Sequence, residues 1–237
     1  MWKIFWNTST TRYTAFGQNA DSRFLTFSVY IYHRALSNSS FAATLRYDPE
    51  HNLTIGYVIL GPYIELEDFR KAVELQFVHI THPLLIPILL TELGTQFRVK
   101  RLIEIHMDLR IIEEQSGFGA WTVTRPVKGS SSQNYREWAR EIGTLDSRCA
   151  FIEADVQSSL LRVDFTMKEI QAMRDYIPAE KFQKLKGAAI KLVNRVEFLE
   201  SNLRHMLVYG GTSKRLRAQQ NVVNNDRSSD SATGWVC

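Results

Sequence analysis

Two short patterns of histidine and acidic residues have spacings that approach those of a metal site. His79 and His82 are three residues apart, and Asp108 follows His106 after one residue. Zinc-binding helices usually place two histidines four residues apart with a glutamate directly after the first. Here no glutamate follows His79, and His82 precedes a proline. We therefore interpret these histidines as helix caps and surface residues, and we predict no metal site.

Acid–base chemistry would need two carboxylates that face one another. Glu104 lies near the histidines in the sequence, and Glu113 and Glu114 are adjacent, so on a helix their side chains diverge by about 100°. The segment Gly117-Phe118-Gly119 lacks the third glycine of a dinucleotide-binding loop and follows a predicted helix instead of a strand. Signatures of hydrolases, kinases and phosphate-binding loops do not occur. The sequence predicts a protein that is not an enzyme, with no catalytic residue and no cofactor.

Long apolar stripes in the second half of the sequence predict the elements that dominate the fold. One stripe has a spacing of alternately three and four residues, and charged residues fill the positions between its members. It consists of Phe182, Leu185, Ala189, Leu192, Val196, Leu199, Leu203 and Met206. A second stripe repeats this spacing with Tyr135, Trp138, Ile142, Leu145, Cys149, Ile152, Val156, Ser159 and Val163. We expect two long helices that pack together, with Phe182, Leu192, Val196, Leu199 and Leu203 buried against the Trp138–Val163 helix.

The first sixty residues have the composition of a small sheet. Aromatic and β-branched residues predict strands over Phe24–Tyr32, Ala42–Tyr47 and Leu53–Leu60. Between the last two lies the turn-forming segment Asp48–Asn52, which predicts a hairpin over Thr44–Ile59.

Helical periodicity begins after the glycine and proline at positions 61 and 62. From Glu65 onward, an apolar stripe predicts a helix through Leu66, Phe69, Val73 and Phe77. A further helix is expected over about Val99–Gln115, with Leu102, Ile105, Leu109 and Ile112 on one face and a stop at Ser116-Gly117. Before this helix, Thr81-His82-Pro83 is expected to be a break or a helix start, and Pro87 is expected to leave a local kink.

These elements predict an α+β fold, with a small N-terminal sheet with helices followed by long antiparallel helices that form a bundle or stalk. Residues 1–116 form the N-terminal part, 117–134 a linker, 135–223 the long-helix region and 224–237 a disordered tail. Ile177-Pro178 separates the two long helices, and Gly210-Gly211 is expected to end the second. The tail is rich in Asn, Asp and Ser without periodicity.

The charge and composition of the chain limit the kinds of molecule that it is expected to bind. The net charge is only +4, but residues 162–217 contain twelve Lys or Arg and six Asp or Glu. The plain interpretation is a solvated helix face, and weak contact with an anionic membrane through Lys214, Arg215 and Arg217 is the alternative. The pattern lacks the features of nucleic-acid binding. We predict self-association or binding of partner helices.

The expected location is cytoplasmic. The most apolar stretch, Phe77–Leu90, is too short to span a bilayer, and the N-terminal residues lack the features of a signal peptide. Two cysteines fit a reducing compartment, with Cys149 in the core and Cys237 at the end of the chain.

Several segments resemble the cytosolic part of the CorA-like divalent cation transporters of filamentous fungi. The likeness extends from about Glu65 to Val223, and the segments that carry it are His82–Pro87, Ile111–Phe118, Asn194–Leu199, Leu203–Leu207 and Arg217–Asn221. The resemblance implies an N-terminal α/β part, long stalk helices and two transmembrane helices with a Gly-Met-Asn ion filter. This chain has no Gly-Met pair and leaves the family pattern near Asn224.

The function that follows is that of a CorA-like cytosolic domain without a pore, which transports no ions on its own. A genuine soluble relative, a truncated gene product and a domain adapted for interactions all fit this pattern. The alternative function is a helical scaffold for protein–protein interactions. An accessory protein of a fungal biosynthetic pathway is a third hypothesis, for which no residue argues.

Overall fold

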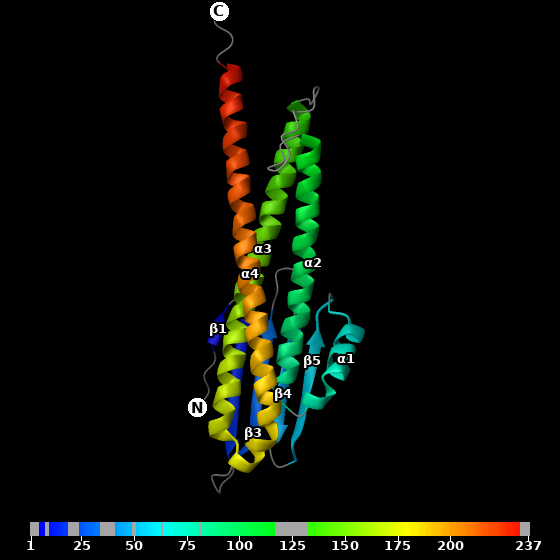
Figure 1. The fold of residues 1–237 in the computed structure, drawn as a ribbon, viewed down its shortest axis with the longest axis vertical. Coiled ribbons are helices and arrows are strands. Elements are labelled where there is room, and N and C mark those ends of the chain that lie inside the picture. Colours follow the sequence, from blue (N-terminus) through cyan, green and yellow to red (C-terminus); the bar gives the residue numbers. More distant parts are fainter. Residues whose placement is uncertain are drawn as a thin grey trace, which may run out of the picture. The chain divides into compact units, whose positions relative to one another are not determined.

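An antiparallel sheet forms the N-terminal part of the protein (Figure 1). The computed structural model describes residues 5–7, 10–18, 24–33, 41–48, 51–62, 64–80, 82–116 and 132–232. In these residues five strands pair in chain order, β1 (Phe5–Asn7), β2 (Thr10–Gln18), β3 (Phe24–His33), β4 (Phe41–Asp48) and β5 (Leu53–Leu60). The three predicted strands are confirmed. Sequence reasoning missed β1 and β2, because the residues from Asn7 to Thr14 are mostly polar, although β-branched threonine suits a strand.

The hairpin predicted between β4 and β5 is confirmed. The two strands are antiparallel, and Asp48 is the residue opposite Leu53. Asn52 adopts a positive φ of 50°, which asparagine tolerates better than most residues, and its Oδ1 accepts a hydrogen bond of 3.0 Å from Tyr47 Oη. His51 Nδ1 lies 2.6 Å from Asp48 Oδ2. Side chains at the end of the hairpin therefore support the turn that the sequence predicted.

The rest of the described chain is helical, which confirms the α+β class. The helices are α1 (Leu66–Leu75), the short 3₁₀ helix η1 (Phe77–His79), α2 (Leu85–Ser116), α3 (Ser132–Tyr176) and α4 (Ala179–Ala232). The start of α1 after Glu65, the end of α2 at Ser116 and the break at Ile177-Pro178 are where the sequence predicted them.

α2 is longer than the helix predicted over about Val99–Gln115. It is one continuous helix from Leu85, which follows the predicted break or helix start at Thr81-His82-Pro83, and it passes through Pro87, where a kink was predicted. Pro87 is the third residue of the helix. The N–H groups of the first turn have no partner within the helix, so a proline there removes no hydrogen bond. The predicted kink is therefore wrong.

α4 continues beyond its predicted end. It passes through Gly210 and Gly211 and ends at Ala232, so residues 224–232 are helical where the sequence predicted a disordered tail. Glycine inside a helix costs about 1 kcal/mol relative to alanine, which weakens a helix without ending it. Residues 117–131 of the predicted linker and 233–237 of the predicted tail, with Cys237, lie outside the described part. The domain boundaries stay predictions.

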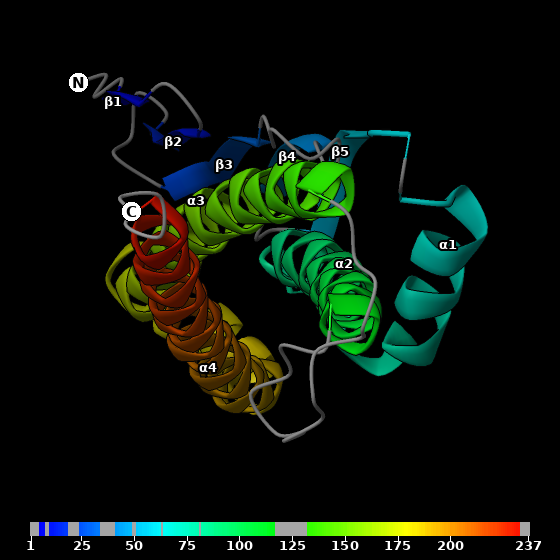
Figure 2. The ribbon, with the colours of Figure 1, turned by 90° about the horizontal axis from the view of Figure 1, so that it is seen from above.

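The chain contains two compact units, to each of which α2, α3 and α4 contribute. Unit 1 is Met1–Arg98 with Ala154–Arg204, and unit 2 is Val99–Glu153 with His205–Cys237. In unit 1 the sheet lies along α3 (Figure 2). Phe41, Ala43, Leu45 and Tyr47 of β4 are buried on its inner face. The helices of this unit therefore cover one face of the sheet.

The two predicted apolar stripes of the long helices, called seams from here on, are largely confirmed as buried. Of the five residues expected in the core, Leu192, Val196, Leu199 and Leu203 are buried and Phe182 is half-buried. Buried members of the second stripe are Leu145, Cys149, Ile152, Val156, Ser159 and Val163. The α2 face of Leu102, Ile105, Leu109 and Ile112 is buried as predicted. Among the described residues, no helix has the length and apolar character needed to cross a membrane.

Candidate functional sites: a buried ion cluster and an exposed apolar helix face

His82 is placed as the cap that the sequence predicted, but it is buried. Its side chain is only 1% exposed, and its Nδ1 accepts a 3.2 Å hydrogen bond from the backbone N–H of Leu84, just before α2. Burial, with a smaller effect from His79, lowers the pKa of His82 to about 4 from the usual 6.5. His82 is therefore neutral at physiological pH, and its acceptor nitrogen satisfies an N–H group that precedes the helix.

This lowered pKa makes the stability of the protein depend on pH. Between pH 6.5 and about 4 the unfolded chain protonates His82 while the folded chain does not, so stability falls as the pH is lowered through this range. We expect a loss of roughly 3 kcal/mol from this residue. His82→Asn, which keeps an acceptor for the Leu84 N–H but does not titrate, should lack this component in urea unfolding measured across the range. Equal pH slopes for both proteins would contradict the assignment.

His106 and Asp108, the second metal-like pair, have structural partners in unit 2. His106 Nδ1 contacts the carbonyl oxygen of Leu102, one turn earlier, at 2.8 Å. Asp108 Oδ2 lies 2.9 Å from Nη1 of Arg148, an ion pair that joins α2 to α3.

The remaining carboxylates of the pattern do not gather around the histidines. Glu104 pairs with Arg101 at 2.7 Å and Glu114 with Arg110 at 2.8 Å, both along the surface of α2. Glu113 is half-buried next to Glu114. Within the described ranges, no group of three His, Cys, Asp or Glu side chains is arranged to hold a metal ion.

Three charged side chains are buried inside unit 1, and sequence reasoning missed them. Arg98 of α2 and Arg162 of α3 are fully buried, and Asp155 of α3 is 3% exposed. Burial lowers the pKa of Arg98 to about 10 from 12.5, while the negative charge of Asp155 opposes this shift. Arg98 therefore stays charged at neutral pH, and we call Arg98, Asp155 and Arg162 the buried ion cluster.

Residues around the buried ion cluster contact its two guanidinium groups or leave space for them. Arg162 Nη2 donates a 2.6 Å hydrogen bond to Ser159 Oγ, which in turn donates to the Asp155 carbonyl oxygen at 2.9 Å. The Arg162 guanidinium lies 5.3 Å from the centre of the Phe41 ring, within the range of a cation–π interaction. A side chain at Gly94 would place its Cβ only 3.2 Å from Arg98 Nη1, so the glycine leaves room for this arginine. The cluster joins the helices to the sheet.

A second interhelical ion pair supports the same unit. Glu92 of α2 and Arg195 of α4 form a bidentate pair, with side chains 18% and 29% exposed. Such a planar, partly shielded arrangement is stronger than an exposed pair. The sequence placed Arg162 and Arg195 in a basic segment interpreted as a solvated face, which is wrong for Arg162. Arg162 lies seven residues after Asp155 and directly before Val163 of the second apolar stripe, so its position could have indicated burial.

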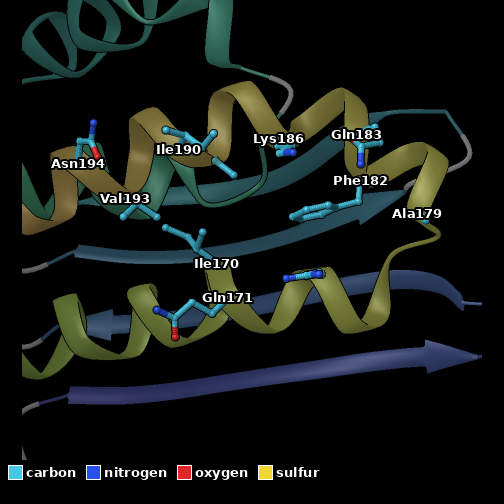
Figure 3. A pocket seen from close by; sticks show the side chains of 11 residues that line it. Ile170, Gln171, Ala179, Phe182, Gln183, Lys186, Ile190, Val193 and Asn194 are labelled. Carbon is cyan, nitrogen blue, oxygen red and sulfur yellow. The ribbon is translucent and has the colours of Figure 1, made fainter.

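A cleft of about 560 Å³ lies between the end of α3 and the start of α4 in unit 1 (Figure 3). Apolar side chains of Ile170, Phe182 and Val193 form much of its wall, together with Gln171 and Asn194. The ring of Phe182 points from α4 toward α3. This open cleft explains why Phe182 is half-buried while the later members of its seam are buried.

Apolar side chains are exposed on the edge of the sheet in unit 1. On β5 the alternate residues Leu53, Ile55, Tyr57 and Ile59 are all exposed, on the face opposite the helices. α1 has no buried residue, although the sequence predicted an apolar stripe there. The predicted helix is confirmed, but its stripe is not part of the core.

An exposed apolar stripe runs along α2 in unit 2. Val99, Ile103, Met107 and Ile111 are 41% to 62% exposed. Val99, Ile103 and Met107 of the stripe also line a groove of about 460 Å³, to which His205 and Met206 of α4 contribute as well. α2 therefore carries apolar residues both on its buried face and on this exposed side. A helix that is apolar on two sides is typical of one enclosed by other helices.

The fold and these surfaces define an α+β protein in which a five-stranded antiparallel sheet is combined with long helices, as far as the described residues show. Comparison with protein-family models gives no match to this chain, and a search among curated proteins gives none either.

Proposed function

We propose that the protein acts without catalysis, as an assembly module whose long helices bind other helices. The observation that carries this proposal is the exposed stripe of α2, where Val99, Ile103, Met107 and Ile111 lie in solvent next to an apolar groove. Contiguous exposed apolar surface of this kind marks protein–protein interaction sites. An amphipathic partner helix would bury the stripe through the spacing of its own apolar residues.

The architecture proposed for this module is that of a CorA-like cytosolic domain that carries no pore and transports no ions by itself. The sheet followed by long helices supports this relation, as do the segments that resemble the fungal transporters. We place the module in the cytoplasm. Contact with an anionic membrane surface through Lys214, Arg215 and Arg217 is a secondary proposal, and the side chains of these residues lie outside the described part.

The state of association of the purified chain tests this function. We expect light scattering during size-exclusion chromatography to give a mass above that of the 27.4 kDa chain in concentrated solution. Ile103→Glu should return the mass toward that of one chain, because a charge in the stripe would have to be desolvated on association. Phe198→Glu is the control, since Phe198 is 69% exposed on α4 outside the stripe.

Two outcomes would overturn the proposal. One is a single-chain mass at every concentration for the unmodified protein. The other is an equal response to Ile103→Glu and Phe198→Glu, which would show that association does not use the stripe. Circular dichroism of both variants establishes that they remain helical.

A further inference from the structure

The exposed side of α2 has a symmetric order of charged and apolar residues. With 100° between successive residues, seven positions from 100 to 114 fall within an arc of about 120°. All seven are exposed, and they are Lys100, Ile103, Glu104, Met107, Arg110, Ile111 and Glu114. We call this arc the α2 outer face.

Read in either direction from its centre, this face has apolar residues at the same distances and charged residues of opposite sign at the same distances. Counted from Met107, Ile103 and Ile111 are equally distant on the two sides, and both are apolar. The same holds for Glu104 with Arg110 and for Lys100 with Glu114, where each pair has opposite charges. A second copy of the face, placed antiparallel with Met107 at the centre, therefore meets apolar residues with apolar residues and each charge with its opposite.

We infer that the α2 outer face binds the same face of a second copy of this chain, with the two helices antiparallel about Met107. This inference rests on the proposed function, because it names the partner of the stripe. A closed two-fold arrangement brings Met107 against its own copy and forms each of the other contacts twice. A parallel two-fold pairing would oppose Lys100 to Lys100 and Glu104 to Glu104, so it is disfavoured by like charges.

The ion pairs seen within one chain do not compete strongly with this arrangement. Arg110 contacts Glu114 along the helix, but both side chains are at least 60% exposed. Exposed pairs of this kind contribute little to stability, so their charges remain available to a second helix. The apolar centre of Ile103, Met107 and Ile111 supplies the attraction, and the flanking charges select the antiparallel register.

Charge reversal in the full-length chain tests the register. Lys100→Glu alone and Glu114→Lys alone should each weaken self-association by roughly tenfold, because each variant converts two attractive contacts into two repulsive ones. The double variant Lys100→Glu with Glu114→Lys restores opposite charges and should recover the original dissociation constant, measured by sedimentation. Such recovery would be specific to the charge pair, because two substitutions that merely perturbed the helix would weaken association additively in the double variant.

A cysteine at the centre provides a second measurement. With Cys237→Ser as background, Met107→Cys should form a disulfide between two chains on mild oxidation, because the two positions meet at the symmetry axis. Cys149 is buried and does not interfere. Glu141→Cys, at an exposed position of α3, is the matched control and should cross-link far less.

The results separate this inference from the proposed function. A chain that associates through Ile103 but shows no rescue in the double variant, or no preference for a cross-link at position 107, overturns the antiparallel pairing and leaves the assembly module standing. A chain that never associates overturns both.

Discussion

Leu199→Asp is expected to lower the free energy of unfolding by about 3 kcal/mol or more. Leu199 is 4% exposed in the seam of α4, between Val196 and Leu203, which are also buried. A carboxylate there would lose its hydration without a counter-charge, and the cavity left by the leucine side chain would remain partly unfilled. Urea unfolding followed by circular dichroism measures the difference.

The neighbouring residue offers a matched control. Phe198 projects about 100° away from Leu199 around the helix and is 69% exposed. Phe198→Asp introduces the same charge one position away and should change the unfolding free energy by less than about 1 kcal/mol. If Leu199→Asp were tolerated as well as Phe198→Asp, the seam could not be part of the core.

Asp155→Ala is expected to cost about 3 to 5 kcal/mol, because it removes the negative charge that acts on the buried Arg98. Arg98 would then remain buried without the negative charge of Asp155, and its pKa would fall further than burial already lowers it. Desolvated cations are far more costly than a missing surface contact.

Asp164→Ala on the same helix is the control for this substitution. Asp164 pairs with Lys168 at 2.7 Å, but the two side chains are 58% and 70% exposed. Its removal should change stability by less than about 1 kcal/mol. Equal effects of the two substitutions, measured by urea unfolding, would show that the buried ion cluster does not stabilise the fold.

Sequence periodicity was sufficient for the elements whose pattern is local. The stripes through Leu192, Val196 and Leu199 and through Leu102 and Ile105 predicted both the helices and their buried faces, because side chains three and four residues apart share one side of a helix. Aromatic and β-branched residues and the turn at Asp48–Asn52 predicted the β4–β5 hairpin, because these signals are also local in the sequence.

Helix ends were less predictable than helices. Pro87 was interpreted as a kink and Gly210-Gly211 as a helix end, yet α2 and α4 run through them. The effect of a proline or glycine depends on its position in the helix and on the contacts of the residues around it, and neither is encoded in the residue type.

The candidate sites depended on contacts between residues far apart in the sequence. The pairing of Glu92 with Arg195 joins positions 103 residues apart, and the electrostatic influence of Asp155 on Arg98 links α3 to α2. Because charged residues are almost always solvated, their type predicts a solvated face and does not reveal the few that are buried with a partner. The sequence by itself therefore determined the helices, most strands and the apolar seams. Only the tertiary structure decided which charges are buried and which apolar face of α2 stays exposed, since both depend on what packs against each helix.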